Sequence, residues 1–147
     1  MGTQIIADPG AQESESAEIG NTYVQVVNGD TVSLAIGTLV EVVIPFDPTA
    51  GAFTVKRSAT TADFLLVGIV SGQAIAVGGS GRVTTEGVAL ALFDAATTQG
   101  DVVTQSTGTA GLCKDNSTTA VASKTIGTVL KSNAVSPYSS YIYVHKT

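Results

Sequence analysis

One β-rich sequence pattern occurs twice in this chain, with its segments in the same order each time. The first copy has three segments, at residues 37–40, 65–70 and 81–84. The second copy has three as well, at residues 100–103, 125–130 and 141–144. The middle segments contain Gly68 and Gly127, and Gly68 lies 15 residues before Val83 as Gly127 lies 15 residues before Ile142. Such self-similarity indicates two related β units packed into one body. The sequence predicts weakly similar halves at about 37–87 and 100–147.

The remaining sequence reads as short apolar segments, rich in Val and Ile, that are separated by turn-forming residues. Strands are predicted at residues 23–27, 32–36, 39–44, 53–57, 64–71, 74–77, 82–86, 101–105, 111–114, 125–131 and 141–145. Many short strands with closely spaced turns predict an all-β fold, a compact β-barrel or sandwich. Segment 88–93 fits a strand or a helical turn, so at most one or two short helices are expected, within 87–98 or near 119–123.

The composition limits both the core and the partners of the chain. Its 147 residues predict a single domain. Aromatic residues make up 5% and Trp is absent, so the core must consist of Val, Ile, Leu and Ala. Only 13% of residues are charged, the net charge is −5, and Lys and Arg are scattered. This pattern argues against direct contact with nucleic acid, because a phosphate backbone attracts a basic patch.

The sequence also indicates in which cellular compartment the protein is made. The longest apolar stretch, residues 88–93, is far too short to span a membrane. The N-terminus lacks the basic and apolar regions of a signal peptide. The single cysteine, Cys113, cannot form an internal disulfide. We therefore expect synthesis in a reducing cytoplasm and no membrane partner.

The N-terminal segment 1–22 differs from the β domain at 23–147. It has few bulky apolar side chains and an acidic excess, so it cannot offset its own ordering entropy. One interpretation is a frayed terminus. The other is an extended arm that becomes ordered against a neighbouring subunit. In that case the expected contact residues are the apolar pair, the turn signal and two of the acids: Ile5, Ile6, Asp8, Pro9, Glu13 and Glu15.

The residues capable of catalysis are few. His145 is the only histidine, and we expect it on an exposed strand face with Tyr141 and Tyr143. Cys113 is expected to be a small buried apolar residue. The glycine cluster 78–81 is expected to form a hairpin loop, because a phosphate-binding loop would have to open a helix. The aspartates are scattered singly, as is typical of turn residues. The sequence predicts no enzyme, no cofactor and no metal site.

Several motifs together carry a resemblance to a known family. They lie at residues 37–40, 65–70, 81–89, 93–94, 97–103, 111–113 and 126–130. With these motifs the chain resembles the small head-decoration proteins of tailed bacteriophages, over roughly residues 21–147. The motifs are short and centred on glycine, so they indicate a scaffold more than a site.

The resemblance implies a structural role in the virion. Such proteins act as capsid cement: they bind the outer surface of an expanded phage head, often as homotrimers, and hold neighbouring major capsid protein subunits together. It implies that the chain is a structural protein on the outer capsid, made in the host bacterial cytoplasm. The arm at 1–22 is then the expected contact with the major capsid protein or with an adjacent decoration subunit.

Two other classes of function are open. The first is a receptor- or carbohydrate-binding β domain of a virion surface fibre, for which Tyr138, Tyr141 and Tyr143 would have to form an aromatic platform. The second is a small hydrolase that depends on His145 or Cys113. A hydrolase needs a nucleophile, a base and an orienting acid within reach of one another.

Overall fold

The computed structural model describes residues 21–44, 53–60, 65–119 and 125–145. These residues form nine strands: β1 (Thr22–Asn28), β2 (Leu39–Val42), β3 (Phe53–Arg57), β4 (Leu66–Ser71), β5 (Ser80–Leu92), β6 (Val102–Gln105), β7 (Cys113–Asp115), β8 (Thr125–Val129) and β9 (Ser139–Val144). The fold is all-β, as predicted, and the described ranges contain no helix. Accordingly, no helical segment in these ranges has the length and hydrophobicity to cross a membrane.

Strands β1 to β5 close into a five-stranded barrel. Their order is β1-β3-β2-β4-β5, and β1 pairs again with β5 to complete the ring. β1 and β3 run parallel, with Val26 opposite Phe53, and the other neighbours are antiparallel. Of the two architectures expected from the sequence, the chain adopts the barrel. Closure matters because it leaves these strands without free edges that could pair with other chains.

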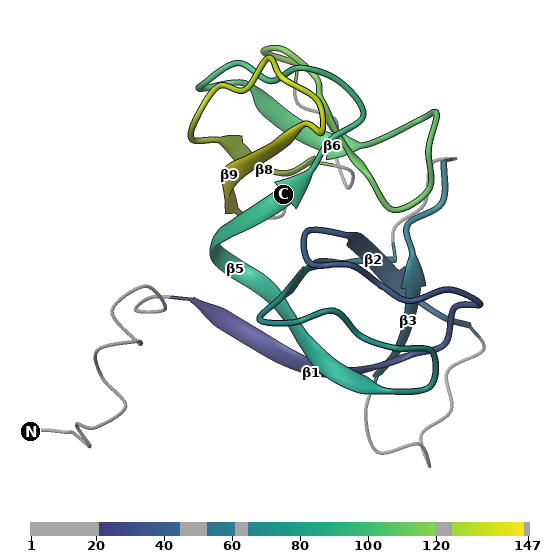
Figure 1. The fold of residues 1–147 in the computed structure, drawn as a ribbon. Coiled ribbons are helices and arrows are strands. Elements are labelled where there is room, and N and C mark those ends of the chain that lie inside the picture. The colour runs from purple at the N-terminus through teal and green to yellow at the C-terminus, as the bar shows by residue number, and fades with distance from the viewer. Residues whose placement is uncertain (1–20, 45–52, 61–64, 120–124, 146–147) are drawn as a thin grey trace, which may run out of the picture.

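The long strand β5 joins this barrel to a second group of strands. Its first part pairs with β1 and β4, and its second part, from Gly87 onward, pairs with β9. β8, β6 and β7 follow in that order. A parallel bridge between Phe93 and Cys113 then brings β7 back beside the end of β5. Figure 1 shows β5 passing from β1 and β3 at the bottom to β9, β8 and β6 at the top.

The repeated glycines occupy equivalent positions in the two groups. Gly68 of β4 lies opposite Val40 of β2, and Gly127 of β8 lies opposite Val103 of β6. In both pairs the strand register shifts directly after this position. A Cβ atom on either glycine would lie 2.1 Å or 2.3 Å from a carbonyl oxygen of the next strand. Both positions therefore require glycine, because the neighbouring backbone comes too close for any side chain.

The turns that precede β2 and β6 are also equivalent. Gly37 has a φ of 97° and Gly100 a φ of 91°. This is the left-handed region, which glycine enters without steric cost. The N–H of Gly37 donates to the carbonyl of Val70 at 2.9 Å, and that of Gly100 donates to the carbonyl of Val129 at 2.8 Å. Each turn is thus fixed to the end of the strand that contains the close-approach glycine.

The core consists of two clusters of buried side chains. One lies among the second group of strands and includes Ala89, Ala91, Phe93, Val103, Cys113, Ile126, Val129, Ile142 and Val144, together with Leu39, Leu66 and Ile69. The other fills the first barrel with Val26, Leu34, Val40, Val55, Val67, Val70, Ile75 and Val83. β2 and β4 contribute to both, because successive side chains of a strand point to opposite faces. Leu39, Leu66 and Ile69 therefore pack the first barrel against the second group of strands.

Two local expectations differ from the structure. Segments 32–36 and 74–77 form only a single antiparallel bridge, between Leu34 and Ile75, instead of full strands. Residues 88–92 belong to strand β5, so the helix considered within 87–98 does not form. Pairing with β9 and burial of alternate residues outweigh the helix propensity of the alanines there. Most of the second possible helix, near 119–123, lies outside the described residues.

Candidate interaction surface

Cys113 and His145 are the side chains on which a hydrolase could depend, and they lie in different surroundings. Cys113 is fully buried in β7, and burial raises the pKa of its thiol, with the charge of Asp94 adding to the effect. His145 follows β9, where its Nε2 lies 2.8 Å from Thr128 Oγ1 and its ring lies 5.3 Å from that of Tyr143. A buried neutral thiol is a poor nucleophile. Cys113 is thus a core residue, as predicted.

Two carboxylates meet at the turn before β6. A hydrogen bond with Asp115, with smaller effects of burial and of the Asp115 charge, raises the pKa of Asp101. Asp115 also accepts the backbone N–H groups of Thr98, at 2.7 Å, and Ser117, at 2.9 Å. These bonds fix turns, the role expected for the aspartates. Within the described ranges, no three His, Cys, Asp or Glu side chains group together in a way that could hold a metal ion.

The glycine cluster 78–81 forms the turn that leads into β5. The N–H of Gly78 donates to the carbonyl of Asn28, and that of Gly79 to the carbonyl of Ala76. A strand follows, beginning at Ser80. The amides are therefore used within the fold and do not open a helix, so the loop lacks the arrangement that binds phosphate groups.

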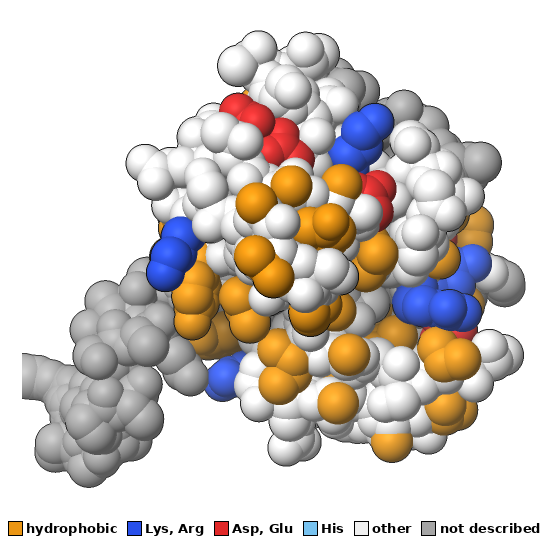
Figure 2. Space-filling view, turned by 45° about the horizontal axis from the view of Figure 1, so that its top comes forward, with side chains coloured by type: hydrophobic (Ala, Val, Ile, Leu, Met, Phe, Trp, Pro, Cys, Tyr) orange, Lys and Arg blue, Asp and Glu red, His pale blue; other side chains and the backbone are white. Residues whose placement is uncertain are grey.

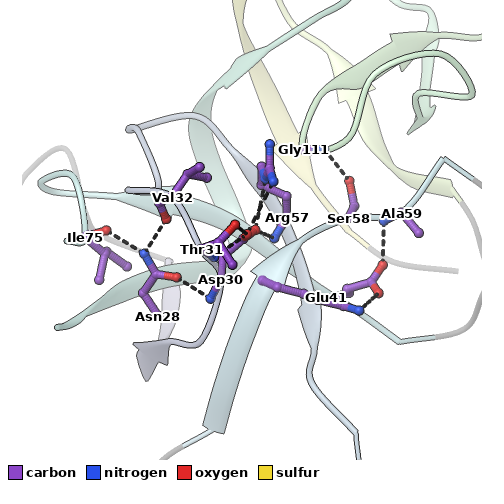
Figure 3. A network of polar contacts seen from close by, with 11 residues as sticks. Asn28, Asp30, Thr31, Val32, Glu41, Arg57, Ser58, Ala59, Ile75 and Gly111 are labelled. Carbon is purple, nitrogen blue, oxygen red and sulfur yellow. Dashed lines mark hydrogen bonds and ion pairs between the residues drawn. The ribbon is translucent and has the colours of Figure 1, made fainter. Parts of the chain in front are cut away.

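A polar network anchors the loop after β1 (Figure 3). Asp30 accepts hydrogen bonds from the backbone N–H and the Nε of Arg57, both at 2.9 Å, and from the N–H of Thr31 at 2.6 Å. The side-chain amide of Asn28 donates to the carbonyls of Val32 and Ile75. These bonds hold the loop to β3 and to the segment before β5, so this network has a structural role.

A second part of the network links the two groups of strands. Gly111 donates its N–H to the carbonyl of Ser58 at 3.0 Å and to its hydroxyl at 3.2 Å. The carbonyl of Gly111 accepts from the N–H of Leu39 at 2.8 Å. The side-chain amide of Gln105 donates to the carbonyl of Ala59. Hydrogen bonds as well as apolar packing therefore keep the two groups in one orientation.

The Asp30–Arg57 pair predicts how stability responds to acid. Burial raises the pKa of Asp30, but hydrogen bonds and charge from Arg57 outweigh it and hold the pKa at about 2, below the ordinary 3.8. A carboxyl whose pKa is lowered by folding contributes stability above its unfolded pKa and loses it as the pH falls through its folded pKa. The Arg57 side chain is 41% exposed, so water weakens the pair.

We therefore expect Asp30→Asn to lower the free energy of unfolding by about 1 kcal/mol at pH 7. The difference between the wild type and the variant should shrink as the pH falls from about 4 to about 2. Urea unfolding of both proteins at several pH values measures it. A difference that stays constant across this pH range would contradict the assignment.

The most distinctive surface is the outward face of the β5–β9–β8 sheet. Strand register places Val88 opposite Tyr143 and Leu90 opposite Tyr141. Leu130, just after β8, donates its N–H to the carbonyl of Tyr141 at 2.8 Å. Four of these side chains are between 42% and 51% exposed, and Leu90 is half-buried. We call Val88, Leu90, Leu130, Tyr141 and Tyr143 the outer sheet face.

Such a face is suited to contacts with a partner. Exposed apolar side chains that adjoin one another across strands are characteristic of interaction sites. In Figure 2, hydrophobic side chains gather over much of the visible surface, whereas charged side chains are few and scattered. Another protein can therefore cover the surface seen in this view without burying many charged side chains.

The predicted aromatic platform is smaller than expected. Tyr141 and Tyr143 share the outer sheet face, as the alternation in the sequence predicts, and the His145 ring lies beside that of Tyr143 at a tilt of 34°. Tyr138 instead packs against the core cluster of the second group of strands. The aliphatic members of the face were not recognised from the sequence. Only the register between β5 and β9 shows that Val88 and Leu90 lie beside the tyrosines.

The contact residues expected in the arm fall outside the described part of the chain. These are Ile5, Ile6, Asp8, Pro9, Glu13 and Glu15. The description begins at Asn21, whose side chain binds the backbone of Val88, at the border of the outer sheet face. The role expected for the arm therefore stays a prediction.

No family model and no curated protein sequence matches the chain. Among the solved structures similar to it are two from bacteriophages. The N base of the head fiber of bacteriophage phi29 has a TM-score of 0.55 and 9% identity, over 84% of this chain and 95% of that one. A chain from the capsid of Myoviridae phage XM1 has a TM-score of 0.54 and 15% identity, over 86% of this chain and 83% of that one. The chain thus shares the fold of a phage head fiber base and of a phage capsid chain.

Proposed function

We propose that this protein is a structural component of a phage virion that binds the outer surface of the head. The observation that carries the proposal is the fold, which is shared over most of the chain with structures from a phage head fiber and a phage capsid. The sequence motifs point independently to phage head-decoration proteins. The shared fold supports the resemblance, although function depends on surfaces and not on fold alone.

The described surface supports a binding role over catalysis. The buried Cys113, the His145 beside Tyr143 and the turn-forming carboxylates do not converge on a reaction site. The outer sheet face offers apolar contact area with few charges. Contacts of this kind gain from repetition on a lattice, because effective concentration lets many weakly bound copies act together. We therefore propose a protein that is not an enzyme and needs no cofactor.

The finer proposal is that of a cement protein. It binds neighbouring major capsid protein subunits, associates with itself as a homotrimer, and bridges the shell against internal pressure. The arm, through Ile5, Ile6, Asp8, Pro9, Glu13 and Glu15, extends to the capsid protein or to an adjacent copy. The protein is made in the host bacterial cytoplasm and makes no direct contact with nucleic acid or membrane. Scattered basic residues and the net charge of −5 support the last point.

The test is binding to empty heads assembled from the major capsid protein of the same phage. We expect the purified protein to co-sediment with expanded heads, to saturate at a fixed number of copies per capsid protein, and to raise the temperature at which the heads break open. Electron microscopy of these heads would place the density on the outside. Absence of saturable binding to expanded heads would contradict the proposal.

A carbohydrate-binding role is the second candidate, and one observation favours it. Tyr141 borders a shallow hollow with Leu90, Lys131 and the polar residues Ser132, Asn133, Ser139 and Ser140. An exposed aromatic ring beside hydroxyl and amide groups is a common way to bind a sugar. A glycan array with the wild type and with Tyr141→Ala distinguishes the two functions. Saturable binding that Tyr141→Ala abolishes would favour the carbohydrate role.

A further inference from the structure

Asn21, the first residue that the structure describes, contacts the border of the outer sheet face. The Oδ1 of Asn21 accepts the backbone N–H of Val88 at 3.0 Å, and its Nδ2 donates to the carbonyl of Val88 at 3.0 Å. Asn21 thereby satisfies both polar backbone groups of Val88, as a residue of a neighbouring strand would. The segment that precedes Asn21 therefore starts from the border of an exposed apolar face.

We propose that the outer sheet face of one copy binds the N-terminal segment, residues 1–20, of a second copy. Ile5 and Ile6 are the apolar residues that cover Leu90 and Tyr141. Each copy thus offers its own segment to one neighbour and accepts the segment of another. The inference deepens the self-association in the proposed function and rests on it, but it concerns the free protein and involves no capsid.

Charge complementarity supports this occupant. Residues 1–20 contain four acidic side chains, Asp8, Glu13, Glu15 and Glu18, and no Lys or Arg. The outer sheet face has a basic residue at one border. Lys131 lies beside Leu90 and Tyr141 around the shallow hollow. An acidic segment with an apolar pair therefore meets an apolar face with Lys131 at its border.

The length of the segment allows it to reach a second copy. Twenty extended residues span roughly 65 Å. A domain of this size is roughly 36 Å across. The segment therefore reaches beyond its own body to the same face of a neighbour. The N-terminal segment of one copy and the outer sheet face of the next are two different surfaces. Contacts of this kind close a ring if the rotation between copies permits it. This geometry is compatible with a trimer.

The first experiment compares full-length variants by light scattering, without capsids. We expect the wild type to be an oligomer at micromolar concentration. Ile5→Glu/Ile6→Glu removes the apolar pair, and Val88→Glu/Tyr143→Glu charges the face. Each double variant should raise the dissociation constant at least tenfold and run as a monomer. Val77→Glu is the matched control, because Val77 is 57% exposed and lies apart from this face, before β5.

Mixing the two monomeric variants tests exchange between copies. The segment variant keeps an intact face, and the face variant keeps an intact segment. We expect a one-to-one mixture to form heterodimers, visible by native mass spectrometry, because one good contact remains. Folding of each variant is checked by its thermal unfolding, with Leu130→Glu as a replacement if the double face variant unfolds.

Several results would overturn the proposal. A monomeric wild type would exclude exchange between copies. Monomeric variants that fail to pair on mixing would contradict the binding of one copy's segment to another copy's face. An oligomer that survives Ile5→Glu/Ile6→Glu but not Val88→Glu/Tyr143→Glu would show that another surface covers the face. Capsid binding by a monomeric wild type would refute this inference and the proposed homotrimer, and would leave the proposed binding to the phage head intact.

Discussion

Gly68→Ala should lower the free energy of unfolding by about 3 kcal/mol, near the upper end of what overpacking a core costs. The added Cβ would lie 2.1 Å from the carbonyl oxygen of Thr84 and 3.0 Å from Val83 Cγ1. The first of these atoms belongs to the backbone of β5, which both groups of strands share, so it cannot move aside cheaply. Equilibrium urea unfolding measures the effect.

The repeat supplies a replicate for this result, and Gly108 supplies a control. Gly127→Ala should cost a similar amount, since its Cβ would lie 2.3 Å from the carbonyl oxygen of Tyr143. Gly108→Ala should change stability by less than about 0.5 kcal/mol, because no atom lies within 4 Å of its added Cβ. Equal effects at Gly68 and Gly108 would refute the close approach of the strands.

Leu39→Ala should destabilise the whole protein, by about 2–5 kcal/mol. Leu39 is fully buried, and although it lies in β2 of the first barrel it packs in the core cluster of the second group of strands. Its N–H also donates to the carbonyl of Gly111, which precedes β7 of the second group of strands. The cavity therefore weakens the contact between the two groups as well as one core.

Two measurements separate this effect from a local one. Tryptophan is absent, so unfolding is followed by far-UV circular dichroism and by amide hydrogen exchange in both groups of strands. We expect one cooperative transition, shifted to lower denaturant, and faster exchange in β8 and β9 as well as in β2. Ile36→Ala, at a side chain that is 41% exposed, should have little effect. A variant in which only β1–β4 lose protection would contradict the shared packing.

The strand positions were predictable because their cause is local. Alternation of apolar and polar residues, or a short apolar run between turn residues, identified β1, β3, β4 and β9 nearly to their ends. The prediction was wrong at residues 32–36 and 74–77, where the pattern suited strands. There the side-chain amide of Asn28 binds the carbonyls of Val32 and Ile75. These side-chain hydrogen bonds occupy backbone carbonyls that a pair of full strands would have used in their own ladder.

The surfaces were less predictable because they depend on register. Tyr141, Tyr143 and His145 were expected on one strand face, since a period of two follows from strand geometry. Val88 and Leu90 lie some fifty residues earlier and read equally well as helix. Pairing with β9 made them a strand and brought them beside the tyrosines. The same pairing left Tyr138 to pack against the core.

By itself the sequence determined the all-β class, the aliphatic core and the repetition of one glycine-centred pattern. These follow from side-chain alternation, composition and turn chemistry, all of which act between residues close in the chain. Only the tertiary structure decided that β5 is shared by both groups of strands, that β2 and β4 pack into two cores, and that an apolar face is left outside. Those features depend on hydrogen-bonded register between segments far apart in sequence, and a local pattern does not specify that register.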